Sequence, residues 1–250
     1  MTPYFLTGED YDLQIQGYRE DLKFYLSEIK KSKNTLEIGC GTGRILLPAL
    51  KAGANIEGLD FSKKMLKTLH QKAKRIGLKP VTYYADMRNF TLGKKYGLII
   101  VPFRPFQHLY NTREQIAALK NFHKHLNRGG KLILNIFNPD YLRMTRSGQK
   151  EFYAYVRDPL TKNKVKISAI NYYYPAEQLL KVTFIHEELD KHNLLVGKKE
   201  YKTTLRYIFR FEFEHLLALS SFKVIKLYGD FKRGKFRDFS REMVWVCQKT

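Results

Sequence analysis

The sequence predicts an α/β fold in which a parallel sheet flanked by helices carries an inserted antiparallel sheet. The first observation is that short β-type segments alternate with helical segments between residues 35 and 137. Such alternation is typical of parallel strands joined by covering helices. The second observation is that β-type segments separated only by turn signals fill residues 152–209. Consecutive strands of this kind predict an antiparallel insertion.

Each element of the parallel part follows from a local pattern. Apolar residues at helical spacing predict one lead-in helix over residues 11–29. Ser62 is a favoured helix cap and Gly77 a favoured helix stop, so a helix is expected between them. The other expected elements are strands 35–38, 55–59, 81–84, 97–101 and 131–137 and helices 44–51 and 113–126.

The second half of the chain predicts mainly strands. Turn signals at 158–159, 163 and 192–193 separate the β-type segments of the insertion. The expected strands there are 152–157, 165–174, 181–189 and 202–209, and a helix over 212–219 and strands over 222–228 and 243–248 follow.

Composition narrows the class of protein. The 250 residues are 44% hydrophobic, which is enough for a globular core. The longest apolar stretch, residues 98–103, is too short to span a bilayer, and the first residues lack the order of a signal peptide. Cys40 and Cys247 are the only cysteines, which excludes a disulfide framework and a cysteine zinc site. We therefore expect a reduced, cytoplasmic protein without a membrane partner.

The net charge of +21 is the unusual feature of the composition. A field of this sign attracts nucleic acid or acidic substrates. The basic residues are spread over both halves of the chain, however, without a run of five like charges. A solubilising surface is therefore favoured, and a nucleic-acid partner stays open but is not favoured.

A glycine-rich turn follows the first strand. Its sequence is Glu37-Ile38-Gly39-Cys40-Gly41-Thr42-Gly43. Glycines let a ligand approach the backbone where a helix begins. A dinucleotide fingerprint requires glycine at position 44, which is arginine, and no phosphate-binding loop is present. Asp60 and Asp86 end the next two strands, where carboxylates can accept hydrogen bonds from a ribose and an adenine amino group. This combination predicts an adenosyl site.

These motifs resemble the class I S-adenosylmethionine-dependent methyltransferase superfamily. The resemblance covers residues 36–43, 58–66, 85–90, 98–108 and 129–139. Residues 205–246, with Tyr-Gly-Asp-Phe at 228–231, resemble the small bacterial and archaeal branch that carries a β insertion. The resemblance implies a Rossmann-like sheet with its last strand antiparallel. It also implies one methyltransferase domain over 1–250, made of a lead-in lid (1–33), a cofactor-binding core (34–140), an inserted β cap (150–210) and a C-terminal part (211–250).

The resemblance also implies roles for individual residues. The cofactor would be S-adenosyl-L-methionine and the product S-adenosyl-L-homocysteine, with no metal. The methionine moiety would be held by Glu37, Gly39, Cys40, Gly41, Thr42 and Gly43. Asp60 would take the ribose, with Phe61 and Met65 beside the adenine and Asp86 and Met87 at its edge. Val101 and Phe103 would line the pocket, and Tyr11 and Tyr18 would act as lids.

The acceptor side rests on fewer signals. His108 is the only histidine in the segment after the fourth strand and is a candidate base, and the alternative is a structural helix cap. Arg104 could neutralise an acidic substrate, and the alternative is a salt bridge. An inserted sheet over the strand ends could also exclude water from an acceptor pocket. Further substrate candidates are Gln107, Tyr174, Arg206, Arg210 and Asp230, for which ordinary sheet, surface or strand-end positions are the alternative.

Three functions fit these motifs. The favoured one is methyl transfer by in-line displacement to a nitrogen or oxygen atom of a small molecule, by a monomer or homodimer. The first alternative is a tRNA or rRNA methyltransferase that uses the basic surface. Val-Pro-Phe-Arg after the fourth strand differs from the Asn/Asp-Pro-Pro-Tyr/Phe pattern of many amino-group nucleic-acid methyltransferases, which disfavours it. The second alternative is a non-catalytic protein that binds S-adenosylmethionine.

Overall fold

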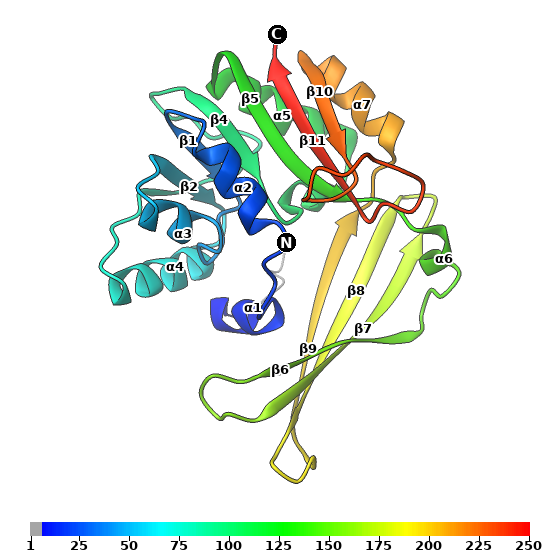
Figure 1. The fold of residues 1–250 in the computed structure, drawn as a ribbon. Coiled ribbons are helices and arrows are strands. Elements are labelled where there is room, and N and C mark those ends of the chain that lie inside the picture. Colours follow the sequence, from blue (N-terminus) through cyan, green and yellow to red (C-terminus); the bar gives the residue numbers. More distant parts are fainter. Residues whose placement is uncertain (1–6) are drawn as a thin grey trace. The chain divides into compact units, whose positions relative to one another are not determined.

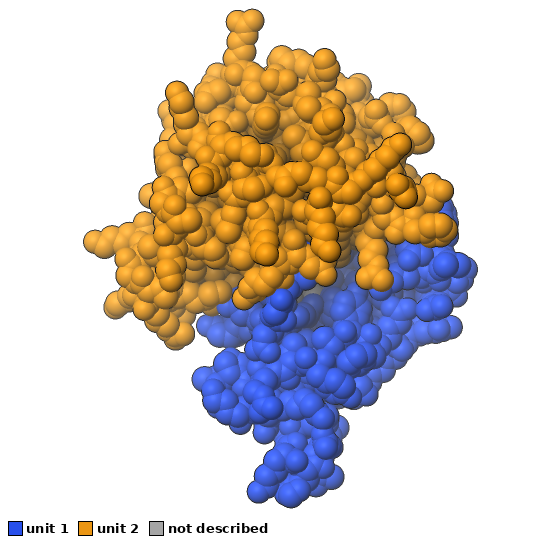
Figure 2. Space-filling model, in the orientation of Figure 1, with its two compact units in different colours: residues 1–18, 140–206 blue, residues 19–139, 207–250 orange. Residues whose placement is uncertain are grey.

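The computed structural model describes residues 7–250, which divide into two compact units (Figure 2). The larger unit comprises Arg19–Pro139 and Tyr207–Thr250. The smaller unit comprises the chain up to Tyr18 together with residues 140–206. Because the chain leaves the larger unit after Pro139 and returns to it at Tyr207, the smaller unit is built mostly from an insertion.

The larger unit contains a seven-stranded sheet (Figure 1). Its strand order is β10-β11-β5-β4-β1-β2-β3. β11 runs antiparallel to both β10 and β5, and the pairs among β1 to β5 are parallel. The mostly parallel sheet with an antiparallel last strand is therefore confirmed. The strands are β1 Thr35–Ile38, β2 Ile56–Asp60, β3 Thr82–Tyr84, β4 Tyr96–Val101, β5 Leu126–Phe137, β10 Phe222–Tyr228 and β11 Glu242–Lys249.

Helices cover both faces of this sheet. The alternation of side chains along β4 shows how, because Ile99 and Val101 pack in one apolar cluster and Leu98 and Ile100 in another. α5 and α7 contribute to the first cluster, and α2 and α3 to the second. The helices of this unit are α2 Leu22–Ile29, α3 Leu46–Lys51, α4 Lys63–Arg75, α5 Thr112–His125 and α7 Arg210–Leu219, with the 3-10 helix η1 at Pro105–His108.

The smaller unit is built on a four-stranded antiparallel sheet of order β6-β7-β8-β9. The antiparallel insertion is thus confirmed. Leu13 of the short helix α1 packs against Val156, Val165 and Ile167 on one face of this sheet. The elements are α1 Gly8–Gln14, α6 Tyr141–Met144, β6 Lys150–Arg157, β7 Lys164–Tyr174, β8 Leu179–Leu189 and β9 Leu195–Arg206.

Two element predictions are wrong. The single helix expected over 11–29 is two helices, because α1 ends at Gln14 and Gly17 adopts φ +81°, a left-handed conformation that ends a helix. β9 begins at Leu195 rather than at 202, since the exposed charges of Lys198 and Glu200 hide a strand at the edge of the sheet. Ser62 caps α4 as expected, and its hydroxyl accepts from the backbone N–H of Met65 at 3.4 Å.

Within residues 7–250, no helix is long and apolar enough to cross a membrane.

Candidate functional site

The glycine turn lies between β1 and α3, where the parallel strands end. We call this region, the carboxyl ends of β1, β2 and β4 with the turn 39–43, the carboxyl edge. Gly39, Gly41 and Gly43 have φ values of +68°, +53° and +85°, a range that residues with a side chain rarely adopt. A β-carbon at Gly39 would lie 2.7 Å from Pro105, whereas one at Gly41 would meet nothing closer than 3.9 Å. Gly41 is therefore less crowded than Gly39 and leaves room beside its backbone.

Asp60 ends β2 beside this turn. Its Oδ2 accepts from the backbone N–H of Gly41 and its Oδ1 from that of Ser62, both at 2.8 Å. The residue is 7% exposed, and burial raises the pKa of its carboxyl although backbone N–H groups oppose this rise. The backbone N–H of Phe61 is a third donor to this carboxylate, and because a carboxylate has about four lone-pair sites, it can still accept from a hydroxyl group of a ligand. Phe61, the next residue, is exposed.

Glu37 is the least satisfied polar group of the carboxyl edge. It lies in β1, is 3% exposed, and its Oε2 has no hydrogen-bond partner within residues 7–250. Burial raises the pKa of Glu37 well above its usual range, although the charge of Arg44 opposes this. A buried carboxylate without a partner destabilises a protein, and a ligand that brings a positive charge or a donor would satisfy it.

A buried ion pair lies beside Glu37. Arg44 donates to both carboxylate oxygens of Asp21, at 2.5 and 2.7 Å, and its guanidinium lies 4.9 Å from the centroid of the Phe103 ring. Asp21 is fully buried. Sequence reasoning missed this pair, because 23 residues separate its members and neither belongs to a motif.

Asp86 follows β3, as predicted, but its carboxylate is held by a neighbour. Arg88 donates to the Asp86 carboxylate from its backbone N–H at 2.8 Å and from its guanidinium at 2.5 to 3.0 Å. The same guanidinium pairs with Glu114 at 2.6 Å. Partial burial alone would raise the pKa of Asp86, but the hydrogen bonds from Arg88 outweigh it and lower that pKa. Met87 is buried in the core, so its side chain supports the fold here.

Four other predicted cofactor residues line or support the turn. The buried Cys40 has its Sγ 2.7 Å from the place where a β-carbon at Gly58 would lie, and burial raises the pKa of its thiol, which disfavours the reactive thiolate. Thr42 accepts from Lys72 Nζ at 3.3 Å. Met65 lies half-buried in the first turn of α4, and Val101 is fully buried at the end of β4.

The segment after β4 has a strained backbone. Phe103 and Arg104 have φ values of +63° and +74°, in the left-handed region. Arg104 forms an ion pair with Glu242 of β11. Gln107 is buried, and its Oε1 accepts from the backbone N–H of Phe137 at 3.1 Å. His108 ends η1 and is half-buried.

The other predicted residues lie elsewhere. Tyr11, Tyr18, Tyr174 and Arg206 belong to the smaller unit, so their predicted roles as lids or substrate contacts stay predictions. Within that unit, Lys181 Nζ lies 4.6 Å from the centroid of the Tyr174 ring, and Arg206 donates to Gln178 at 2.9 Å. In the larger unit, Arg210 begins α7 and its guanidinium lies over the Phe211 ring. Asp230 accepts from the backbone N–H groups of Lys232 and Gly234.

Strand register separates the run of three tyrosines, Tyr172, Tyr173 and Tyr174, at the end of β7. Tyr173 pairs with Leu180, and alternation places it on the face of the sheet that carries His186 and Tyr201. Tyr174 is on the opposite face. Tyr173 is therefore the tyrosine of this run that shares a face with α1 and its polar partners.

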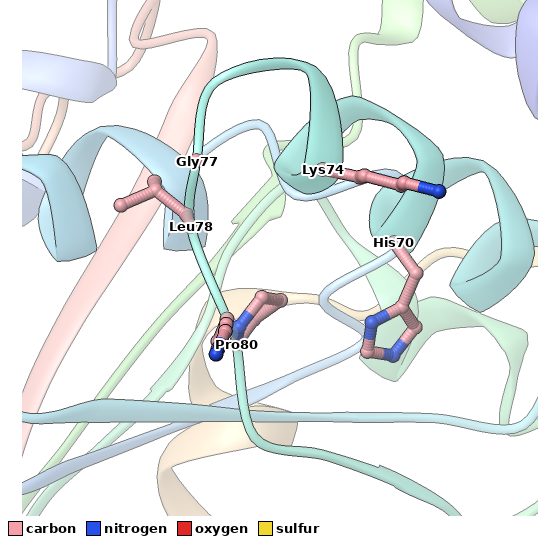
Figure 3. A pocket seen from close by; sticks show the side chains of 6 residues that line it. His70, Lys74, Gly77, Leu78 and Pro80 are labelled. Carbon is pink, nitrogen blue, oxygen red and sulfur yellow. The ribbon is translucent and has the colours of Figure 1, made fainter.

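A separate hollow of about 370 Å³ lies where α4 leads into β3 (Figure 3). His70 and Lys74 of α4 and the loop from Gly77 to Pro80 line it. This is the amino end of β3, whereas the glycine turn lies at the carboxyl ends of the strands, so the hollow is not part of the candidate site. Within the described residues, no three His, Cys, Asp or Glu side chains form a group that could hold a metal ion, and the expected absence of a metal stays a prediction.

Residues 35–130 match the family described as a methyltransferase domain. The chain is 29% identical, over 135 residues, to dTDP-3-amino-3,6-dideoxy-alpha-D-glucopyranose N,N-dimethyltransferase of Streptomyces fradiae, and the match covers 51% of each chain. The chain thus spans about half the length of the curated relatives it first matches.

Two solved structures share the fold over nearly the whole chain. The CcbJ methyltransferase of Streptomyces caelestis superimposes with a TM-score of 0.79 at 21% identity and covers 94% of this chain and 97% of its own. CalS10, an amino pentose methyltransferase of Micromonospora echinaspora solved with S-adenosylmethionine bound, gives 0.74 at 18% identity, with complete coverage of both chains.

Proposed function

We propose an activity for this chain on the premise that it belongs to the class I methyltransferases, through a methyltransferase domain that spans residues 35–130. It transfers a methyl group from S-adenosylmethionine to an amine of a small molecule by in-line displacement. The observation that carries this proposal is the carboxyl edge, where Glu37 Oε2 has no hydrogen-bond partner among the described residues, Gly41 leaves room beside its backbone and Asp60 can accept further donors.

Each of these residues fits one part of the cofactor. Glu37 would accept from the ammonium group of the methionine moiety, which supplies the positive charge that the buried carboxylate lacks. Gly41 would allow the cofactor to approach the backbone. Asp60 would accept from a ribose hydroxyl while it continues to hold the turn through Gly41. Phe61, exposed beside it, would contact the adenine.

Methyl transfer from a sulfonium depends mainly on position. The bound cofactor supplies an activated methyl group, so the protein has to align the acceptor with it and exclude water. An amine attacks only when its lone pair is free, and His108 is the candidate base that takes its proton. Arg104 is engaged by Glu242, so we assign it to the geometry of the turn rather than to contact with substrate.

A nitrogen acceptor in a small molecule is supported by the comparisons. The Streptomyces fradiae relative is named for the dimethylation of an amino sugar, and CalS10 for an amino pentose. The RNA alternative lacks comparable support, because it rests on net charge alone. The small-molecule hypothesis is therefore preferred to the RNA hypothesis.

The cofactor assignment is tested by calorimetry with S-adenosylhomocysteine. Asp60→Ala removes a hydroxyl acceptor and the anchor of the turn, so the Kd should rise by about 10- to 100-fold, or roughly 1–3 kcal/mol. Asp190→Ala is the matched control, because Asp190 also accepts two backbone N–H groups, from His192 and Leu194, but lies in the loop after β8. An unchanged Kd in Asp60→Ala would show that the cofactor binds elsewhere.

The acceptor class is tested with the tritiated methyl donor. The panel is dTDP-3-amino-3,6-dideoxyglucose, glycine, sarcosine and bulk RNA. We expect label in a small amine. Label in RNA that disappears as salt is added would instead support the RNA alternative, since phosphate contacts weaken steeply with ionic strength. Cofactor binding without transfer to any acceptor would support a non-catalytic role.

A further inference from the structure

The turn after β4 is held by a buried polar network that no motif predicts. Two consecutive residues other than glycine, Phe103 and Arg104, adopt left-handed φ values there. Such conformations cost free energy and persist only where the surrounding structure enforces them. What enforces them here is a set of side chains from α2, β5 and β11, all within the larger unit.

Asn135 of β5 is the centre of this network. Its Oδ1 accepts from the backbone N–H of Phe103 and from the hydroxyl of Tyr25, both at 2.9 Å. Its Nδ2 donates to Glu242 Oε2 at 2.9 Å. Glu242 pairs through its other oxygen with Arg104. The network therefore holds both strained residues, one through its backbone and the other through its side chain.

The identity of residue 135 is specified by its partners. Oδ1 accepts from two donors, and Nδ2 donates to a carboxylate. If the amide group were rotated by 180°, its hydrogens would point at the donors of Phe103 and Tyr25, and its oxygen would face the carboxylate of Glu242. An aspartate would place a second carboxylate against Glu242. Tyr25 and Asn135 are almost fully buried, which makes each unmade hydrogen bond costly and the arrangement rigid.

The turn also contacts the cofactor side of the carboxyl edge. A β-carbon at Gly39 would lie 2.7 Å from Pro105, so the glycine turn and η1 are packed together. The guanidinium of Arg44 lies over the Phe103 ring at 4.9 Å while it pairs with Asp21. The turn is thus fixed between the glycine turn on one side and the Asn135 network on the other.

We propose that Tyr25, Asn135 and Glu242 are positioning residues that hold the turn from Phe103 to His108 in the geometry required for methyl transfer. They touch no substrate and act through the backbone of Phe103 and the side chain of Arg104. The inference rests on the proposed function, because it assigns the acceptor to the face that this turn presents. The strain of the turn is maintained by a network that no cofactor motif contains.

Hydrogen exchange measures the turn without any substrate. Glu242→Gln and Tyr25→Phe each remove one interaction while they keep the side-chain volume, and Asn135→Leu removes the centre. Amide exchange of residues 103–108 should accelerate by about tenfold or more in Glu242→Gln. Tyr96→Phe is the matched control, because it removes another buried tyrosine hydrogen bond, to Glu57 at 2.7 Å, from the amino end of the same strand β4. Exchange of residues 103–108 should not change in Tyr96→Phe.

Kinetics separate a positioning role from a structural one. In Glu242→Gln the kcat should fall by about 10- to 100-fold, because small displacements of reacting groups are costly. The Kd of S-adenosylhomocysteine should stay within about twofold, since the side chain of Glu242 pairs with Asn135 and Arg104 rather than with Glu37, Gly41 or Asp60. Tyr25→Phe should show the same pattern at smaller size, and it remains informative if Asn135→Leu does not fold.

Three results would overturn the proposal. They are unchanged exchange in Glu242→Gln, faster exchange with unchanged kcat, and a loss of kcat in Tyr96→Phe as large as that in Glu242→Gln. Failure of the proposed function is distinguishable, because it would appear in the wild type as no binding of S-adenosylhomocysteine or no transfer to any amine. In that case the exchange measurement still decides whether the network holds the turn.

Discussion

The carboxyl edge of the larger unit and the cluster around Asp10 in the smaller unit both bury carboxylates, but the pKa values of these carboxylates are shifted in opposite directions. At the carboxyl edge, burial raises the pKa values of Glu37 and Asp60, and Glu37 Oε2 has no partner among the described residues. In the smaller unit, Asp10 of α1 accepts from Tyr201 and Thr7 at 2.9 Å and from Lys199 at 3.2 Å. Burial alone would raise the pKa of Asp10, but these hydrogen bonds outweigh it and lower that pKa.

The difference separates a structural carboxylate from one available to a ligand. A carboxylate that stabilises a fold is surrounded by donors, as Asp10 is, because an unpaired buried charge destabilises the protein. Among residues 7–250, Glu37 and Asp60 form no ion pair of their own, which is expected where the missing partner is a ligand. Asp10 is thus fully partnered within the smaller unit, whereas the carboxylates of the carboxyl edge are open to a ligand, which the proposed function takes to be the cofactor.

The largest expected effect comes from removing Arg44, the cation of the buried ion pair that lies beside Glu37. Arg44→Leu would leave Asp21 buried and unpaired, so the free energy of unfolding should fall by about 3–5 kcal/mol in urea titration. The double variant Asp21→Leu/Arg44→Leu should regain part of this loss, because apolar pairs often replace buried ion pairs at little cost. A loss below about 1 kcal/mol in Arg44→Leu would contradict the buried pair.

The next effect is a pH dependence of the smaller unit. His186 is 3% exposed, and burial lowers its pKa to about 4, although the charge of Asp10 opposes this and that of Lys199 adds to it. Between about pH 6.5 and pH 4, the His186 ring is therefore protonated in the unfolded chain but neutral in the folded chain. Stability should fall through that window by at most roughly 3 kcal/mol and should be fully retained above it.

An imidazole titration by NMR checks this prediction directly. The His186 ring should titrate near pH 4 in the folded protein. His186→Phe should flatten the pH dependence of unfolding between 6.5 and 4, while the remaining carboxylates keep their own dependence at lower pH. A ring that titrates near its ordinary value of about 6.5 would show that water reaches it.

The carboxyl edge could be predicted from the sequence, whereas the Asn135 network could not, because local patterns mark the first and only long-range contacts form the second. Strand–helix alternation predicts where parallel strands end, so Glu37, the glycine turn and Asp60 were placed at one edge without a structure. The Asn135 network joins residues more than a hundred positions apart, from Tyr25 to Glu242, and no local pattern marks it. In the insertion, only the strand register shows that Tyr173 and Tyr174 lie on opposite faces of the sheet, because a run of three tyrosines does not reveal the register of its strand.

A smaller effect is expected at Glu37, where one substitution should keep or raise the stability of the free protein and should weaken cofactor binding. Glu37→Gln removes a buried charge without a cationic partner of its own, so the unfolding free energy of the free protein should stay equal or rise. The Kd of S-adenosylmethionine should rise by a factor that corresponds to roughly 1.5–3 kcal/mol, the value of a hydrogen bond to a charged group. Calorimetry and urea titration measure both. A loss of stability in Glu37→Gln would mean that the carboxylate is structural, as Asp10 is.

The smallest effect tests the fully partnered side of the comparison. Tyr201→Phe removes one of the donors to Asp10 and leaves Thr7 and Lys199 in place. The unfolding free energy should fall by only about 0.5–1.5 kcal/mol, because a carboxylate with several partners is never left unpaired by the loss of one. The pKa of Asp10 should rise, since a hydrogen bond that lowers it is gone. Because the site proposed for the cofactor contains no residue of this cluster, the Kd of S-adenosylhomocysteine should not change. A change in that Kd would show that the inserted sheet and the carboxyl edge act together, and the contrast between a structural and a ligand-binding carboxylate would then fail.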